Sequence, residues 1–112
     1  MINWTRVTEL YTDFGEDGFS EIVDVFLEEM AESLGRLADA EDHKSLEAEF
    51  HFLKGAALNV GFDEMARICA EGEALASQGE PSDAHKAQLL THLPQTCDSF
   101  LKQWRSKMAA QA

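Results

Sequence analysis

The chain has 112 residues, 45% hydrophobic and 27% charged, and no stretch approaches the roughly 18 consecutive apolar residues of a membrane span. Acidic residues outnumber Lys and Arg by 21 to 9, and the formal net charge of -12 disfavours nucleic acid and anionic lipid as partners. We therefore expect one globular domain, residues 1–112, in the cytoplasm, because the N-terminus also lacks the layout of a signal peptide.

Apolar residues recur at the spacing of a helix face along almost the whole chain, and no segment shows sustained strand-like alternation. This pattern predicts five helices, which in chain order cover residues 4–14, 17–40, 43–60, 62–78 and 82–107. Gly15 separates the first two helices, and Gly61 ends the third. We expect Asp17 and Ser82 to be N-caps, because their side-chain oxygens can accept a hydrogen bond from a first-turn amide.

The last predicted helix contains Pro94, which removes a backbone donor and clashes with the preceding turn. The apolar stripe keeps its phase across this proline, so we expect a kink and not a break. Long amphipathic helices with short connections pack as an antiparallel up-down bundle, here about residues 17–107. The predicted fold is all-α, a four-helix bundle with an additional short N-terminal helix across one end.

Apolar stripes define the predicted core of each helix. Cys69 and Cys97 lie on these stripes, in no metal or redox spacing, so we interpret both as core residues. The stripe residues are Trp4, Val7, Leu10, Tyr11, Phe14, Phe19, Val23, Phe26, Met30, Leu34, Leu37, Leu46, Phe50, Leu53, Ala57, Val60, Met65, Ile68, Cys69, Gly72, Leu75, Ala76, Leu90, Leu93, Cys97, Phe100, Leu101 and Trp104.

A second face of the helix at residues 43–60 carries His51, Lys54 and Gly55, well away from its core stripe. A neutral imidazole is a competent nucleophile, and Lys54 at i+3 can reach the same space and stabilise phosphoryl oxygens. Gly55 at i+4 leaves no side chain beside the ring, which would let a partner close over it. A histidine and a lysine at this spacing also occur on ordinary solvated faces, so a purely structural role stays open.

These residues resemble the signature of histidine-containing phosphotransfer (HPt) domains. The family's pattern is a histidine, then Lys-Gly at the third and fourth positions after it, and a glycine at the tenth. Here His51, Lys54, Gly55 and Gly61 match in that order. The helix that follows also resembles the family's pattern, with Glu73 at a familiar polar position.

The resemblance implies that His51 is transiently phosphorylated on its outward ring nitrogen and that Lys54 faces the phosphoryl group. Glu73 matches a position that, in relatives, hydrogen-bonds the other ring nitrogen and fixes the tautomer; a solvated charge is the alternative. Relatives often carry small hydroxyl residues after Lys-Gly, where this chain has Ala56 and Ala57. We interpret these two alanines as packing residues.

The function that the resemblance implies is that of a phosphocarrier in a two-component phosphorelay. His51 would accept a phosphoryl group from a receiver-domain aspartate or a sensor histidine kinase and pass it to a response-regulator aspartate. The partner would supply Mg²⁺, and we expect no cofactor in the chain itself. If exposed, Phe52 forms a docking surface with Leu58 and Phe62; packing against a neighbouring helix is the alternative for Phe52.

Other classes of function fit the sequence less well. No nucleotide-binding loop is present, and the length leaves no room for a kinase catalytic domain, so we do not expect an ATP-dependent enzyme. Neither Glu-x-x-His nor His-Glu-x-x-His occurs, which disfavours a metal-binding bundle, and the other histidines read as surface or capping residues. The remaining alternatives are a non-catalytic scaffold and a regulatory module that binds a receiver domain or kinase. We expect a monomer.

Overall fold

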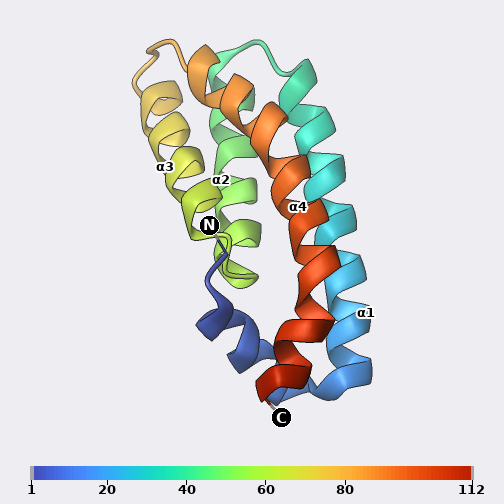
Figure 1. The fold of residues 1–112 in the computed structure, drawn as a ribbon. Helices are drawn as coiled ribbons and strands as arrows, with labels where there is room; N and C mark the ends of the chain where they lie inside the picture. The colour runs from blue at the N-terminus through green and yellow to red at the C-terminus, as the bar shows by residue number, and fades with distance from the viewer. Residues whose placement is uncertain (1, 112) are drawn as a thin grey trace.

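The computed structural model describes residues 2–111, which form four helices and no strands (Figure 1). The helices are α1 (Trp4–Asp39), α2 (His43–Asn59), α3 (Asp63–Ser77) and α4 (Asp83–Gln111). Each helix packs against two neighbours: α1 against α2, α2 against α3, α3 against α4, and α4 back against α1. The predicted all-α class is confirmed. None of these helices is long and apolar enough to cross a membrane.

Helix α1 changes direction at Gly15, whose φ of 75° and ψ of 171° are not helical. Glycine adopts this conformation without the steric penalty that a side chain would bring. The turns before Gly15, dark blue in Figure 1, lie at the end of the bundle below α2 and α3. We expected two helices separated at Gly15; the non-helical Gly15 divides α1 into two helical segments that form one kinked element. Asp17 already lies inside it, so the prediction that Asp17 is an N-cap is wrong.

The N-terminus is held against the turn between α2 and α3. The amide of Asn3 donates to the carbonyl of Gly61 at 2.6 Å, and its side-chain amide donates to Asp63 at 2.9 Å. Gly61 has a φ of 80°, and a Cβ there would lie 2.6 Å from the carbonyl oxygen of Asn3. Only glycine permits this approach. The predicted end of the helix at Gly61 is confirmed, and Asn3 caps α1 by accepting from the amide of Arg6.

Aromatic rings fill the core at the end where the N-terminal segment lies. Phe100 of α4 stacks with Trp4 at a centroid distance of 5.7 Å and meets Phe62 edge-on at 5.6 Å. Phe19 meets Trp104 edge-on at 5.0 Å. Such ring pairs add to the stabilisation from burial alone, so this cluster fixes the N-terminal segment on α4.

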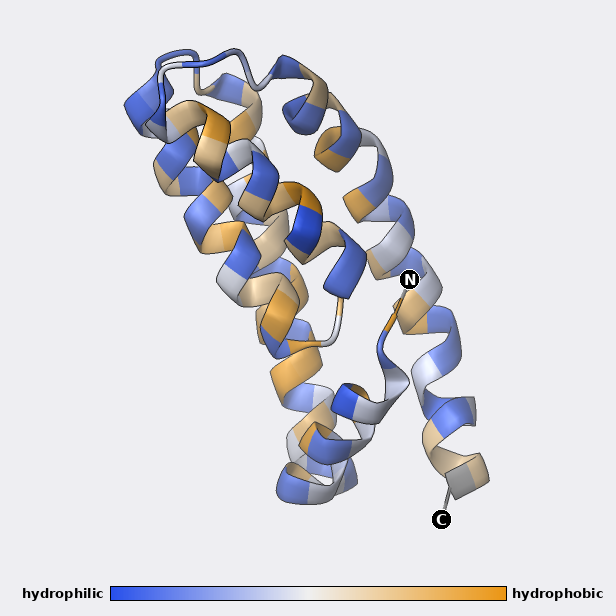
Figure 2. Cartoon of the chain, turned by 90° about the vertical axis from the view of Figure 1, so that its left-hand side faces the viewer, coloured by the Kyte–Doolittle hydropathy of each residue, from blue (hydrophilic) through white to orange (hydrophobic). Residues whose placement is uncertain are grey.

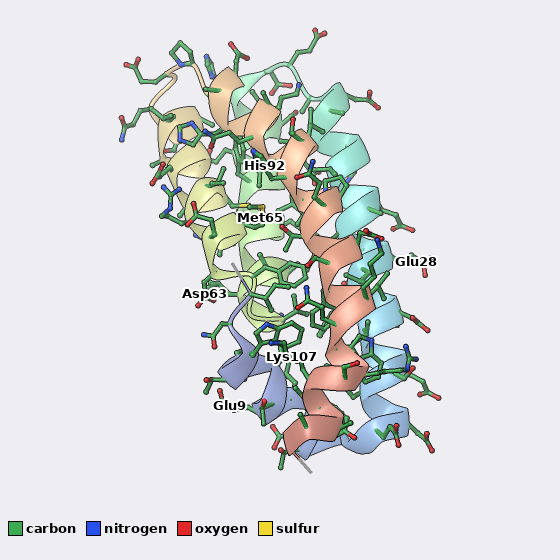
Figure 3. The ribbon with its side chains drawn as sticks, in the orientation of Figure 1. Glu9, Glu28, Asp63, Met65, His92 and Lys107 are labelled. Atoms are coloured by element: carbon green, nitrogen blue, oxygen red, sulfur yellow. The ribbon has the colours of Figure 1, made fainter. Side chains whose placement is uncertain are left out.

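Most of the predicted core is buried or half-buried, and hydrophobic positions recur between hydrophilic ones along each helix (Figure 2). In Figure 3, Met65 lies between α3 and α4, whereas Glu28 projects from α1 into solvent. Phe14, Leu90 and Leu101 were predicted to be core residues and are exposed. Phe14 directly precedes the kink at Gly15, and on α4 the buried positions are Leu89, Leu93, Phe100, Trp104 and Met108.

Both cysteines are free, with Cys69 buried and Cys97 half-buried, as expected for core residues. Burial raises the pKa of the Cys69 thiol to about 12 and that of Cys97 to about 11.

Helix α4 continues through Pro94 without splitting. Ser82 stands at the predicted cap position, where its carbonyl accepts from the amide of Lys86 at 3.0 Å. Its buried hydroxyl has no hydrogen-bond partner among residues 2–111, so the predicted side-chain cap does not form.

Candidate functional site

Helix α2 is fixed by a cap at its start and by one apolar face. The Asp42 carboxylate accepts from the amide of Ser45 at 3.0 Å, and the hydrogen bonds from Ser45 lower the pKa of Asp42. Four residues of the apolar face are buried: Leu46, Phe50, Leu53 and Ala57. His51 lies on another face, and 69% of its side chain is exposed. The nucleophile proposed from the sequence therefore stands at the bundle surface on a rigid helix.

Close packing of α3 on α2 brings a second element to His51. A Cβ at Gly72 would lie 2.6 Å from Cε1 of Phe50, so the absence of a side chain at Gly72 lets the two helices approach here. Glu73 follows Gly72 directly, as His51 follows Phe50. The close approach therefore places the carboxylate of Glu73 within reach of the histidine ring.

The Glu73 carboxylate bridges two residues of α2. Its Oε2 lies 2.8 Å from Nδ1 of His51, and its Oε1 accepts from Nζ of Lys54 at 2.6 Å. The hydrogen bond from Lys54 is the largest cause of a lowered pKa for Glu73, and the bond to His51 lowers it further. An ionised carboxylate can only accept hydrogen bonds, so Nδ1 of His51 must carry the proton. In the neutral imidazole, the other ring nitrogen, Nε2, then holds the free lone pair.

The surroundings of the ring leave Nε2 accessible. His51 makes no hydrogen bond through Nε2 within residues 2–111. A Cβ at Gly55 would have no heavy atom within 4 Å, so the packing of the bundle does not require glycine at this position. Lys54 is half-buried, with 30% of its side chain exposed. Together these residues form an exposed imidazole with an oriented tautomer and an ammonium group one turn away.

The three predicted docking residues fall in two different environments. Phe52 and Leu58 are 42% and 51% exposed, on the same helix as His51. Phe62 is fully buried and packs on Phe100, because the turn at Gly61 directs the chain into the core. The prediction that Phe62 belongs to a docking surface is therefore wrong.

Sequence reasoning missed Arg36 of α1, which lies over the ring of Phe52 with 5.6 Å between its guanidinium carbon and the ring centroid. The available signal was weak: Arg36 is the only lysine or arginine between Arg6 and Lys44. The position of this arginine in the sequence does not show which residue of the neighbouring helix Arg36 contacts.

Within residues 2–111, the other histidines make no hydrogen bond to His51, Lys54 or Glu73. His92 is exposed, whereas His85 is half-buried, with Nε2 3.1 Å from Oε1 of Glu71. Over residues 2–111, no three histidine, cysteine, aspartate or glutamate side chains are grouped so that they could hold a metal ion.

The chain is similar to a known protein family and to a known protein. The family model for the Hpt domain matches residues 21–108. The chain is also 26% identical over 105 residues to the phosphorelay protein LuxU of Vibrio harveyi, an alignment that covers 89% of this chain and 92% of that protein. No solved structure matches the chain at a significant level.

Proposed function

Because the chain belongs to the Hpt domain family, we propose that it is a phosphocarrier of a two-component phosphorelay. In this role, His51 accepts a phosphoryl group from a receiver-domain aspartate or a sensor histidine kinase and passes it to a response-regulator aspartate. One observation carries the proposal: the Glu73 carboxylate lies 2.8 Å from Nδ1 of an imidazole that is otherwise open to solvent.

The chemistry follows from the tautomer of His51. The lone pair of Nε2 attacks the phosphorus of an aspartyl phosphate, and the bond from phosphorus to the aspartate oxygen breaks. The aspartate leaves as a carboxylate with the bonding electron pair. Nδ1 keeps its proton, so the ring gains a positive charge that faces the Glu73 carboxylate. In onward transfer an acceptor carboxylate attacks the same phosphorus, and the electron pair of the nitrogen–phosphorus bond returns to Nε2.

Lys54 supplies the nearest positive charge. We propose that its ammonium group, which bonds Oε1 of Glu73 at rest, turns toward the phosphoryl oxygens once they are present. Phosphoryl transfer also needs charge neutralisation at the donor and acceptor, which Mg²⁺ bound to the partner receiver domain would supply. The acidic chain would then need no cofactor of its own.

The open side of the ring is where a partner would dock. Gly55 presents no side chain beside His51, so a receiver domain can bring its aspartate close to Nε2. Phe52 and Leu58 are exposed apolar residues on the same helix, and we propose that they contact that receiver domain.

The proposal is tested by transfer of labelled phosphate. A receiver domain phosphorylated with labelled acetyl phosphate is mixed with the protein and Mg²⁺, and the label on the protein is tested for acid and base stability. Phosphohistidine is labile in acid and stable in base. His51→Gln should abolish the label and leave the helical circular dichroism unchanged, whereas the control His92→Gln should keep it. Label that persists in His51→Gln would remove His51 from the reaction, and binding without labelling would favour a regulatory module.

A further inference from the structure

A chain of contacts runs from the interior of the bundle to the ring of Phe52. The hydroxyl of Ser33, which is fully buried, donates to Oε1 of Glu49 at 2.9 Å. The other oxygen of Glu49 accepts from Nε of Arg36 at 3.0 Å. The guanidinium group of Arg36 in turn lies over the ring of Phe52. Phe52 of α2 therefore contacts α1 through Arg36, and Glu49, which Ser33 also bonds, holds the guanidinium group of Arg36.

The direction of the Arg36 side chain is informative. Glu32 and Asp39 lie at i−4 and i+3 on the same helix, at spacings that favour ion pairs. The hydrogen bond of Arg36 instead crosses to α2. A planar guanidinium group can bond a carboxylate along one edge and lie flat on a ring, which the ammonium group of lysine cannot do.

Phe52 is the residue for which this arrangement matters. It follows His51 in the chain and remains 42% exposed, so water and not the bundle surrounds much of its ring. An exposed ring that is held in one orientation loses less conformational freedom when a partner binds it. Rigid aromatic residues of this kind often supply most of the binding energy of an interface.

We propose that Arg36 is a positioning residue that holds Phe52 in the orientation in which a receiver domain docks beside His51. The inference rests on the proposed function, because it takes the receiver domain as the partner. Phe52 makes the contact with an apolar part of the receiver surface, and Arg36 acts through Phe52 without touching the partner. The location supports this occupant, since Phe52 is exposed one residue from His51 on the same helix, within the area that a receiver domain bound at His51 can cover.

The test is a double-mutant cycle on transfer kinetics. Purified phosphorylated receiver domains are first compared, and the one that transfers its phosphoryl group to this protein fastest is chosen as the partner. The KM for that receiver domain and the kcat of transfer are then measured separately. Arg36→Ala should raise KM about two- to fivefold at unchanged kcat, the size expected for loss of an exposed cation–aromatic contact. Phe52→Ala should raise KM about tenfold or more. The double variant should match Phe52→Ala alone, because Arg36 acts only through the ring.

Two controls keep the result specific. Arg36→Lys should behave like Arg36→Ala, whereas Arg67→Ala, which removes the same charge from α3, should leave KM unchanged. Circular dichroism verifies that each variant is folded. Labelling of His51 by phosphoramidate, which needs no partner, should be equal in all variants.

The outcomes separate this inference from the function on which it rests. An unchanged KM in Arg36→Ala, with normal transfer by the parent protein, overturns the role of Arg36 and leaves the phosphocarrier function intact. Additive effects in the double variant would also overturn it, because Arg36 would then contact the receiver itself. Absence of transfer from every receiver domain to the parent protein would contradict the proposed function and, with it, the role of Arg36.

Discussion

Glu73 of α3 lies 2.8 Å from Nδ1 of His51 on α2, and the same carboxylate accepts a hydrogen bond from Lys54. One side chain therefore fixes both the tautomer of the ring and the resting position of the nearest cation. The proposed phosphoryl chemistry depends on this shared carboxylate.

Glu73→Gln should slow phosphoryl transfer to His51. The amide can still accept the hydrogen bond from Nδ1, but it cannot neutralise the positive charge that the ring gains. We expect a loss of about tenfold or more in the single-turnover rate, by analogy with carboxylates that orient metal-bound histidines. Rapid-quench measurement with a phosphorylated receiver domain gives the rate. Glu71→Gln, a change on the same helix away from His51, is the matched control, and equal losses in the two variants would count against a special role for Glu73.

The contribution of Glu73 to stability should depend on pH. The hydrogen bond from Lys54 holds the pKa of Glu73 below its ordinary value of 4.5, so the folded state binds protons less readily than the unfolded state. The stabilisation is therefore fully present above the unfolded-state pKa and is lost as the pH falls through the folded-state pKa. Urea unfolding should show Glu73→Gln to be less stable than the parent by about 0.2–1 kcal/mol at pH 7. This difference should shrink toward zero as the pH falls through the folded-state pKa of Glu73, and a difference that grows in acid would show that another group is responsible.

Lys54→Ala should slow transfer without unfolding the bundle. The ammonium group is half-buried but lies outside the core, so its removal should leave the circular dichroism unchanged. The rate should fall about ten- to hundredfold, at or below the loss seen when one oxyanion-hole donor is removed. Lys44→Ala, which removes an exposed lysine from the first turn of α2, should transfer at the parent rate. Parent-like transfer by Lys54→Ala would show that this cation does not act on the phosphoryl group.

Two glycines near the site should respond to substitution in opposite directions. A Cβ at Gly55 enters open space, so Gly55→Ala should stabilise α2 by up to about 1 kcal/mol, the difference in helix propensity. A Cβ at Gly72 would collide with the ring of Phe50, so Gly72→Ala should destabilise the protein despite the same gain in propensity. Thermal unfolding of both variants measures these signs. Destabilisation by Gly55→Ala would mean that glycine is needed there for packing and not for access.

Larger residues at position 55 test whether Gly55 gives a receiver domain access to Nε2 of His51. Gly55→Gln should slow transfer from a receiver domain, because a long side chain would stand where the partner approaches Nε2. Labelling by phosphoramidate, a small donor, should change little. Equal slowing with both donors would instead indicate that the substitution disturbs His51 itself.

Relationships within one helix could be predicted from the sequence. The helical period alone places His51, Lys54 and Gly55 on a face away from Leu53 and Ala57, and the structure has this arrangement. The glycine at position 61 ends α2 as expected, because its positive φ is open to glycine and rare for other residues.

Relationships between elements could be predicted only in part. The resemblance to a family suggested Glu73, whereas the contact between Arg36 and Phe52 depends on how α1 and α2 align, which the periodicity of either helix does not specify. Phe62 was misplaced because it follows a turn, where the helical period no longer indicates direction. The monomeric state, the cytoplasmic location and the Mg²⁺ of the partner stay predictions.

The most direct test of the account is to observe the phosphorus–nitrogen bond. The protein is labelled with ¹⁵N at its histidine rings, phosphorylated by a receiver domain, and studied by NMR for coupling between phosphorus and the ring nitrogens. We predict coupling to Nε2 of His51, with Nδ1 still protonated and bonded to Glu73. Phosphorus on Nδ1, or on any residue other than His51, would contradict the account.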